Sequence, residues 1–138
     1  VVATGVGAMR AATSPESTWS ALPHFRGVRI GRAEQAQIQS RASRMASVLG
    51  PAPFLLNEDN GLYYLVAGLK NPTPFDEPHV MNFGIHGQAD VVRALAAGTA
   101  RPVCMGDMSG PLEPSDIVRY VRSAMTPGDD LGVCVVYR

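Results

Sequence analysis

Residues 53–68 read PFLLNEDNGLYYLVAG, and this stretch decides the fold that the sequence predicts. PFLL at 53–56 is a short continuous apolar run, which is typical of a buried parallel strand. NEDN at 57–60 is a polar turn that can cap a helix through Asp59 or Asn60. GLYYLVAG at 61–68 then predicts a short helix that Gly68 ends. A buried strand followed directly by a helix is a building unit of α/β domains.

The same alternation continues on both sides of this unit. Upstream, GVRI at 27–30 is a strand candidate, and residues 32–49 place apolar side chains on one helical face before Gly50 and Pro51 end the helix. Downstream, the pattern predicts a weak strand near 80–84, helices over 88–97 and 116–125, a buried strand over 101–105, a turn at 127–130 and a closing strand over 131–137.

This order of elements predicts an α/β fold with a mostly parallel twisted sheet and helices on both faces. Such a Rossmann-like fold has three layers, and its final strand either joins in parallel or runs antiparallel at an edge. We expect a single α/β domain over 27–138. A loosely patterned segment over 1–26 precedes it, in which VVATGV at 1–6 is a candidate edge strand.

The composition is that of a folded domain with no surplus of either charge. The 138 residues are 46% apolar and 17% charged, and the formal net charge is +0. A nucleic-acid partner is not expected, because such partners require a clustered basic surface. No stretch approaches the roughly 18–20 apolar residues that span a bilayer. The chain begins with Val1 and shows no intact signal peptide, which favours a processed product or a piece of a longer protein.

The common cofactor and metal motifs are missing from the sequence. GVGAMR at 5–10 lacks the third glycine of a dinucleotide-binding loop, and neither a phosphate-binding P-loop nor a GxSxG nucleophile elbow occurs. The three histidines have no metal-ligand spacing, and the two cysteines form no CxxC pair. We therefore predict no cofactor, no metal and no catalytic residue.

The two cysteines, Cys104 and Cys134, lie in separate apolar runs and allow two interpretations. Both can be buried thiols that behave as small hydrophobic side chains. Alternatively they form one disulfide, if their strands are neighbours and the compartment is oxidising.

Polar side chains follow two of the predicted strands, where open parallel sheets bind their ligands. Asn57, Glu58 and Asp59 follow the first buried strand, and Asp107 follows the strand over 101–105. The loop from Asn71 to His79 can supply a third polar group. Such residues can contact a ligand, but they can equally cap helices and form Asx-turns.

A longer motif links Tyr63 to Asp76. The segments Leu62-Tyr63-Tyr64-Leu65 and Gly68-Leu69-Lys70-Asn71-Pro72-Thr73-Pro74-Phe75-Asp76, with Leu22-Pro23-His24-Phe25-Arg26-Gly27-Val28-Arg29 upstream, resemble the soluble C-terminal domain of bacterial membrane glycosyltransferase-like proteins. These are GT-C type proteins, related to the dolichyl-phosphate-mannose protein mannosyltransferases. The resemblance covers about residues 22–138. Pro74, Glu77 and Pro78 depart from the family pattern.

The resemblance implies a non-catalytic domain on the extracytoplasmic face of the cell membrane. Its partners would be the membrane-embedded part of the parent chain, which uses a polyprenol-phosphate sugar, and a glycan or polyprenyl-linked sugar. The family's catalytic acids lie in loops between membrane helices, a region that this chain does not include, so no catalytic residue is transferred. Such a domain would assist acceptor or glycan binding, or act as a scaffold.

The loop from residue 71 to residue 76 allows a structural and a ligand-binding interpretation. Pro72 and Pro74 fix φ and push Asn71 and Thr73 toward extended conformations, so the loop is stiff. It can be a rigid connection that seats the short helix on the sheet, with Asp76 accepting backbone N–H groups. It can also recognise a sugar, with the rings of Tyr63 and Tyr64 stacking on it.

Two other kinds of protein fit the same sequence. A free-standing small enzyme or ligand-binding protein would use Asn57, Glu58, Asp59 and Asp107 around a pocket at the strand ends. A purely structural interaction module would use none of them. Fold alone does not choose between these functions.

Overall fold

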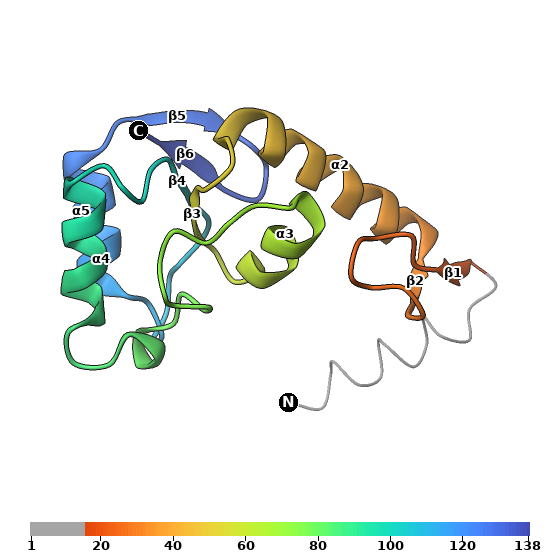
Figure 1. Cartoon of the computed structure of the whole chain (residues 1–138), viewed down its shortest axis with the longest axis horizontal. Coiled ribbons are helices and arrows are strands. Elements are labelled where there is room, and N and C mark those ends of the chain that lie inside the picture. The colour runs from red at the N-terminus through yellow and green to blue at the C-terminus, as the bar shows by residue number, and fades with distance from the viewer. Residues whose placement is uncertain (1–15) are drawn as a thin grey trace.

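The computed structural model describes residues 16–138, and its elements are labelled as in Figure 1. The expected strand at 1–6 and the glycine loop at 5–10 lie outside the described residues. In chain order the elements are β1 (Ser17–Trp19), β2 (Arg29–Gly31), α2 (Arg32–Leu49), β3 (Phe54–Leu56), α3 (Asn60–Ala67), the 3₁₀ helix η1 (Val80–Phe83), α4 (Gly87–Ala96), β4 (Val103–Met105), α5 (Ser115–Ala124), β5 (Pro127–Asp130) and β6 (Val135–Tyr137).

The central sheet is mixed, so the expected mostly parallel, Rossmann-like sheet is wrong. Its four strands follow the order β3-β4-β6-β5, and β3 and β4 form its one parallel pair among the described strands. β6 runs antiparallel to both β4 and β5. The final strand is therefore antiparallel as one alternative allowed, but it lies inside the sheet and not at an edge.

A tight hairpin causes this topology. Residues 127–130, expected to form a turn, form β5, and the chain reverses over the next four residues into β6. Gly132 has a φ of 81°, which suits glycine, and its N–H donates to Asp130 Oδ1 at 2.7 Å. The hairpin returns β6 antiparallel to β5, and it places β6 beside β4.

The weak strand expected near 80–84 is the 3₁₀ helix η1 instead. The Val80 N–H donates to the Leu112 carbonyl at 2.9 Å, while the Asn82 N–H donates back to His79 within the turn at 2.9 Å. Phe83 is buried and packs on the ring of Phe75, with centroids 4.9 Å apart. The aromatic contact therefore holds this segment against the loop before it.

Two apolar cores lie on opposite faces of the sheet because side chains alternate along each strand. Phe54, Leu56, Val103 and Met105 pack with residues of α4 and α5, including Val91, Leu95, Ile117, Val118 and Val121. Leu55, Cys104 and Val136 pack with Ala42, Met45 and Leu49 of α2 and Tyr63 of α3. Figure 1 shows α4 and α5 side by side on one side of the sheet and α2 and α3 on the other.

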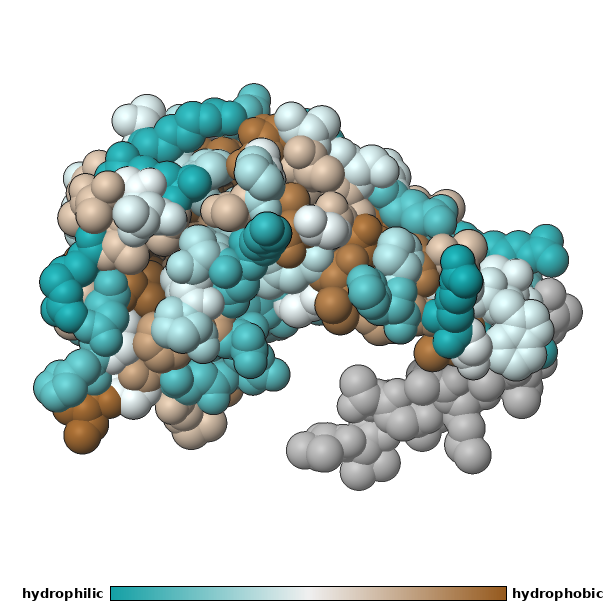
Figure 2. Space-filling model, viewed as in Figure 1, coloured by the Kyte–Doolittle hydropathy of each residue, from teal (hydrophilic) through white to brown (hydrophobic). Residues whose placement is uncertain are grey.

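The helix expected over 32–49 is confirmed as α2, which reaches beyond the sheet. Its far end carries the small antiparallel pair β1 and β2, with Trp19 opposite Arg29 (Figure 1). The Arg29 guanidinium lies 5.6 Å from the Trp19 ring centroid, within the range of a cation–π interaction. Figure 2 shows hydrophobic side chains gathered where α2 meets α3, while hydrophilic residues follow β5 along the top.

None of the helices in the described part of the chain combines the length and the hydropathy that crossing a membrane requires.

Candidate functional site

Four of the predicted residues meet at the carboxyl ends of β3 and β4. Asn57, Glu58, Asp59 and Asp107 line one depression of about 230 Å³. Its other lining residues are Arg41 from α2 and Gly132 and Val133 from the β5–β6 turn. We call this depression the strand-end pocket. Its position follows the general rule that parallel strands present ligand sites at their carboxyl ends.

Asn57 is the buried member of the strand-end pocket. The residue is 5% exposed, and its side-chain carbonyl oxygen Oδ1 is fully buried with no hydrogen-bond partner among the described residues. The Asn57 backbone carbonyl is engaged, since it accepts the Asn60 N–H at 3.2 Å at the start of α3. A buried acceptor without a donor costs about 1–3 kcal/mol, so this side chain lowers the stability of the folded protein.

We expect Asn57→Leu to leave the free energy of unfolding unchanged or to raise it by up to about 1 kcal/mol, because the substitution removes an unpaired oxygen at similar volume. Asn60→Leu is the matched control, since Asn60 is equally buried but donates from Nδ2 to the Asp76 carbonyl at 3.0 Å. The free energy of unfolding of Asn60→Leu should fall by about 1–3 kcal/mol. Urea unfolding measures both, and an equal loss in the two variants would contradict an unpaired Asn57.

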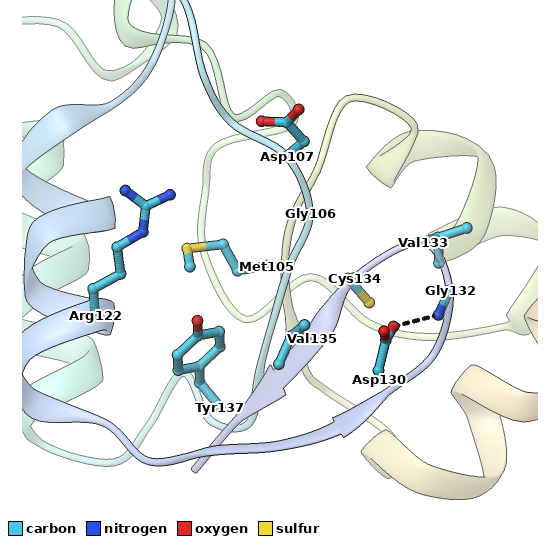
Figure 3. Close-up of a pocket in the computed structure, with 10 residues that line it drawn as sticks. All are labelled: Met105, Gly106, Asp107, Arg122, Asp130, Gly132, Val133, Cys134, Val135 and Tyr137. Carbon is cyan, nitrogen blue, oxygen red and sulfur yellow. Dashed lines mark hydrogen bonds between the residues drawn. The ribbon is translucent and has the colours of Figure 1, made fainter.

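Asp107 belongs to the strand-end pocket and to a second, larger depression beside it. This β4–α5 pocket of about 390 Å³ is lined by Met105, Gly106, Asp107, Arg122, Asp130, Gly132, Val133, Cys134, Val135 and Tyr137 (Figure 3). Hydrogen bonds from the hydroxyl and the backbone N–H of Ser109 lower the pKa of Asp107, and the charge of Arg122 adds to this shift. In Figure 3 the charged ends of Asp107 and Arg122 point toward one another across the pocket.

The chemistry of these groups favours binding over proton transfer. A lowered pKa keeps Asp107 ionised near neutral pH, so its carboxylate accepts hydrogen bonds and is a poor general acid. No group of three or more histidine, cysteine, aspartate or glutamate residues within residues 16–138 is arranged to hold a metal ion. The arrangement can therefore orient a polar ligand through several hydrogen bonds at once.

The two cysteines form a disulfide next to the two pockets, and Cys134 itself lines the β4–α5 pocket. Cys104 and Cys134 are joined with their Cα atoms 5.4 Å apart, and both side chains are buried. Of the two interpretations of the sequence, the structure therefore has the disulfide. Because Cys134 follows Val133 directly, the bond fixes the turn at 131–134 to β4. It thereby holds one wall of the strand-end pocket.

The loop after α3 uses its polar side chains on its own backbone. Asn71 Nδ2 donates to the Phe75 carbonyl at 2.7 Å, and Asn71 Oδ1 accepts the Thr73 N–H at 3.0 Å and its hydroxyl at 2.9 Å. The Asp76 carbonyl accepts the amide of Asn60, which ties the loop to the start of α3. These bonds give the loop the geometry of a rigid connection.

We expect Asn71→Ala to lose about 1–2 kcal/mol of unfolding free energy, because it removes three hydrogen bonds that close the loop. Asp76→Ala is the control in the same loop. The side chain of Asp76 is exposed, so its removal should change the free energy of unfolding by no more than about 0.5 kcal/mol. Thermal unfolding of both variants checks this, and equal losses would show that Asn71 does not hold the loop.

The two tyrosines of the motif lie away from the strand-end pocket. Tyr63 is 1% exposed in the core between α2, α3 and the sheet. The Tyr64 hydroxyl accepts the Leu55 N–H at 2.9 Å and donates to the Pro53 carbonyl at 2.9 Å. β3 is an edge strand, so this hydroxyl occupies backbone groups that would otherwise stay open to another strand. Burial raises the pKa of Tyr64 to about 12, against a smaller lowering by the bond to Leu55.

This pKa predicts an alkaline loss of stability. The unfolded chain releases the phenolic proton near pH 10, whereas the folded chain holds it to about pH 12. The stabilisation is complete below pH 10 and falls by about 2–3 kcal/mol as the pH rises to about 12. Tyr64→Phe should remove this slope and cost about 1–3 kcal/mol at pH 7, because Leu55 N–H and Pro53 C=O lose their partner. Urea unfolding of the wild type and of Tyr64→Phe between pH 7 and 12 measures both the alkaline slope and the loss of stability at pH 7.

Tyr120→Phe is the control for Tyr64→Phe, since its ring also packs on a core but its hydroxyl makes no hydrogen bond within the described chain. It should keep the alkaline slope of the wild type. Parallel alkaline curves for the two variants would show that Tyr64 is not the responsible group.

His79 lies in a separate small depression of about 130 Å³, which it shares with Glu58, Leu112 and Glu113 among others. Its Nδ1 is 3.9 Å from Glu77 Oε2. The structure therefore brings four predicted residues together, places His79 at a neighbouring depression that includes Glu58, and leaves the tyrosines and the 71–76 loop elsewhere.

Sequence patterns did not reveal Arg41, Arg122, Gly132 and Val133. Arg41 and Arg122 follow no motif, because their position depends on how the helices cross the strand ends. Gly132 and Val133 were missed because residues 131–137 were expected to form one closing strand, either parallel or antiparallel at an edge. The succession of Asp130, Leu131 and Gly132 was the available signal, since an aspartate side chain readily accepts the backbone N–H two residues further on, and glycine suits the positive φ of a turn.

Comparison of this chain with protein-family models, with curated proteins and with solved structures found no match in any of the three. We therefore base the functional proposal on the geometry of the strand ends, on the disulfide and on the resemblance of the 62–76 motif.

Proposed function

We propose that this chain is a non-catalytic, extracytoplasmic domain of a membrane glycosyltransferase-like protein that uses a polyprenol-phosphate sugar. It assists acceptor or glycan binding, or holds the parent's loops in place. The Cys104–Cys134 disulfide carries the proposal, because buried structural disulfides are typical of oxidising compartments outside the cytoplasm. The resemblance of residues 62–76 to GT-C type proteins indicates the class of membrane protein to which the domain would belong.

The internal hydrogen bonds of the 71–76 loop support the scaffolding part of this role. Asn71 and Thr73 are occupied by the loop's own backbone. The loop's Phe75 packs against Phe83 and so close to Gly87 that a Cβ there would lie 2.7 Å from the Phe75 ring. The motif that resembles the family therefore fixes α3 to the α4 side of the domain.

The experiment is to determine the complete reading frame that encodes this chain and to express it with a C-terminal tag. We expect several apolar spans of about 20 residues in the frame and the tag in the membrane fraction. Protease should remove the tag from intact spheroplasts. Acid trapping followed by alkylation should find Cys104 and Cys134 oxidised. A soluble cytoplasmic product with reduced cysteines would overturn the proposal.

A free-standing ligand-binding protein is the second candidate. The gathering of Asn57, Glu58, Asp59 and Asp107 around one pocket favours it, since this is where such a protein would bind. A reading frame without apolar spans, or with a signal peptide alone, would favour this candidate over a membrane parent.

A further inference from the structure

The two-stranded sheet of β1 and β2 holds an exposed tryptophan in a fixed position. Trp19, the one tryptophan of the chain, is 65% exposed although most of its side chain is apolar. The backbone around it is well bonded, since Arg29 donates to the Ser17 carbonyl at 3.2 Å and the Ser20 N–H donates to the Val28 carbonyl at 2.8 Å. The exposure of Trp19 is therefore a property of a built surface.

The same segment is rich in exposed arginine. Residues 17–32 contain no aspartate or glutamate, and their three arginines are Arg26, Arg29 and Arg32. All three are exposed, and they take part in none of the ion pairs found within residues 16–138. With the flanking Glu16 and Glu34 included, three positive and two negative charges leave this end of the molecule at +1, while the whole chain is at +0.

This combination of side chains suits the boundary between water and lipid. Tryptophan is enriched at membrane interfaces because its ring is apolar and its N–H is polar. Arginine near a membrane surface is attracted to anionic headgroups, and its guanidinium matches the phosphate oxygens. Val28, which is 52% exposed and precedes Arg29, adds apolar area.

The place of the two-stranded sheet in the chain agrees with a membrane contact. Under the proposed function the membrane-embedded part of the parent precedes this domain, so β1 is the described strand nearest to the membrane in sequence. Figure 1 shows β1 and β2 at the far end of α2, away from the central sheet. A bilayer that met this end would leave the central sheet at the other end of α2.

The other strongly exposed apolar side chains suit a charged bilayer less well. Met81 in η1 and Ile85 just after it are 73% and 93% exposed. Residues 79–87 contain no lysine or arginine, so the attraction to anionic headgroups is missing there. This segment therefore offers a control for apolar exposure alone.

We propose that Trp19, Val28, Arg26, Arg29 and Arg32 form a membrane-facing surface that binds a bilayer containing anionic phospholipid. This inference rests on the proposed function and names the partner of one end of the domain. The Trp19 ring and Val28 enter the headgroup region, and the arginines bind lipid phosphates. Arg29 also keeps its place 5.6 Å from the Trp19 ring centroid, so one cation and the ring approach the bilayer together.

The fluorescence of Trp19 tests this surface directly, because the chain has no other tryptophan. Residues 1–138 with an N-terminal histidine tag are bound to vesicles that carry a nickel-chelating lipid. This tether stands in for the parent's membrane segment and gives an effective concentration in roughly the millimolar range. The vesicles are of phosphatidylcholine alone or of equal parts phosphatidylcholine and phosphatidylglycerol, each with and without bromine-labelled acyl chains.

On the mixed vesicles we expect the Trp19 emission to move to shorter wavelength and the bromine label to quench it. On phosphatidylcholine alone the emission should stay that of an exposed indole. Raising NaCl from about 0.05 to 0.5 M should reverse most of the shift on the mixed vesicles, because salt screens the attraction between arginine and phosphate.

Two double variants test the arginines at equal change in net charge. Arg26→Gln with Arg32→Gln should lower the ratio of membrane-bound to free Trp19 about tenfold or more, since each arginine near an anionic surface contributes about fivefold. Both side chains are exposed, so this variant should keep the wild-type Tm. Arg93→Gln with Arg119→Gln is the control, because it removes two exposed arginines from α4 and α5. It should keep the full response, as should Ile85→Ala.

Unchanged Trp19 emission without bromine quenching on the mixed vesicles would overturn the inference, and an acidic protein would then be the partner to seek. An equal response on neutral vesicles, or an equal loss in the two double variants, would overturn it as well. Membrane fractionation of the complete reading frame tests the proposed function without vesicles. A membrane-bound parent whose domain ignores the vesicles would refute this inference alone. Vesicle binding by a chain whose reading frame encodes no apolar span would refute the membrane parent alone.

Discussion

The Cys104→Ala, Cys134→Ala double variant is expected to lose about 3–4 kcal/mol of unfolding free energy, and its Tm should fall by roughly 10–15 °C. The bond closes a loop across a sequence separation of 30 residues, and opening it restores chain entropy to the unfolded state. Both sulfurs are buried in the core between the sheet and α2, so packing is also lost. Urea and thermal unfolding measure the change.

Reduction supplies the control for this variant. Dithiothreitol should lower the Tm of the wild type by a similar amount once alkylation and mass measurement show that both thiols are free. It should not alter the Tm of the double variant, which has no bond to reduce. A wild type that keeps its Tm after complete reduction would show that the disulfide contributes nothing, and the support for an oxidising compartment would weaken with it.

The effect should extend to the strand-end pocket. Gly132 and Val133 form part of its wall and are the two residues before Cys134. Without the bond, the turn is held by the Leu131 N–H to Cys134 carbonyl bond at 2.9 Å and by the Asp130–Gly132 bond. We therefore expect the amide protons of Leu131 and Gly132 to exchange faster with solvent in the double variant, even at temperatures where it remains folded.

Local patterns predicted most of the helices and buried strands because their signals lie within a few residues. Gly50 with Pro51 marks the end of α2, and Gly68 ends α3 with a φ of 65°. The continuous apolar runs that contain β3 and β4 reflect burial on both faces, and these two strands do pair in parallel. In such segments the local sequence pattern and the tertiary packing favour the same secondary structure.

Strand order was not predictable in the same way, because it depends on contacts between distant residues. The Pro127–Asp130 segment has turn composition, yet it forms an edge strand whose residues are all exposed. Its acidic side chains tolerate solvent and discourage pairing with another chain. At the opposite edge, the Tyr64 hydroxyl covers β3. The site was partly predictable, since Asn57 and Asp107 follow β3 and β4, which form the parallel pair, whereas Arg41 reaches the site through helix packing.

The second large effect is expected at Gly106, which lies between β4 and Asp107. A Cβ added there would come within 2.9 Å of both the Asn57 Cβ and the Val133 carbonyl oxygen. The Gly106 N–H also donates to the Leu56 carbonyl at 2.9 Å, so the backbone is held against β3. Neither obstacle is the end of a flexible side chain. Gly106→Ala should therefore cost about 3 kcal/mol of unfolding free energy.

Gly61→Ala is the matched control, because Gly61 lies in α3 with no atom within 4 Å of an added Cβ. It should raise the stability by about 0.5–1 kcal/mol, since alanine favours the helix over glycine. Urea unfolding compares the two, and similar effects would contradict the close approach at Gly106. The absence of a side chain at Gly106 thus lets the ends of β3, β4 and the β5–β6 turn meet closely enough to form one pocket.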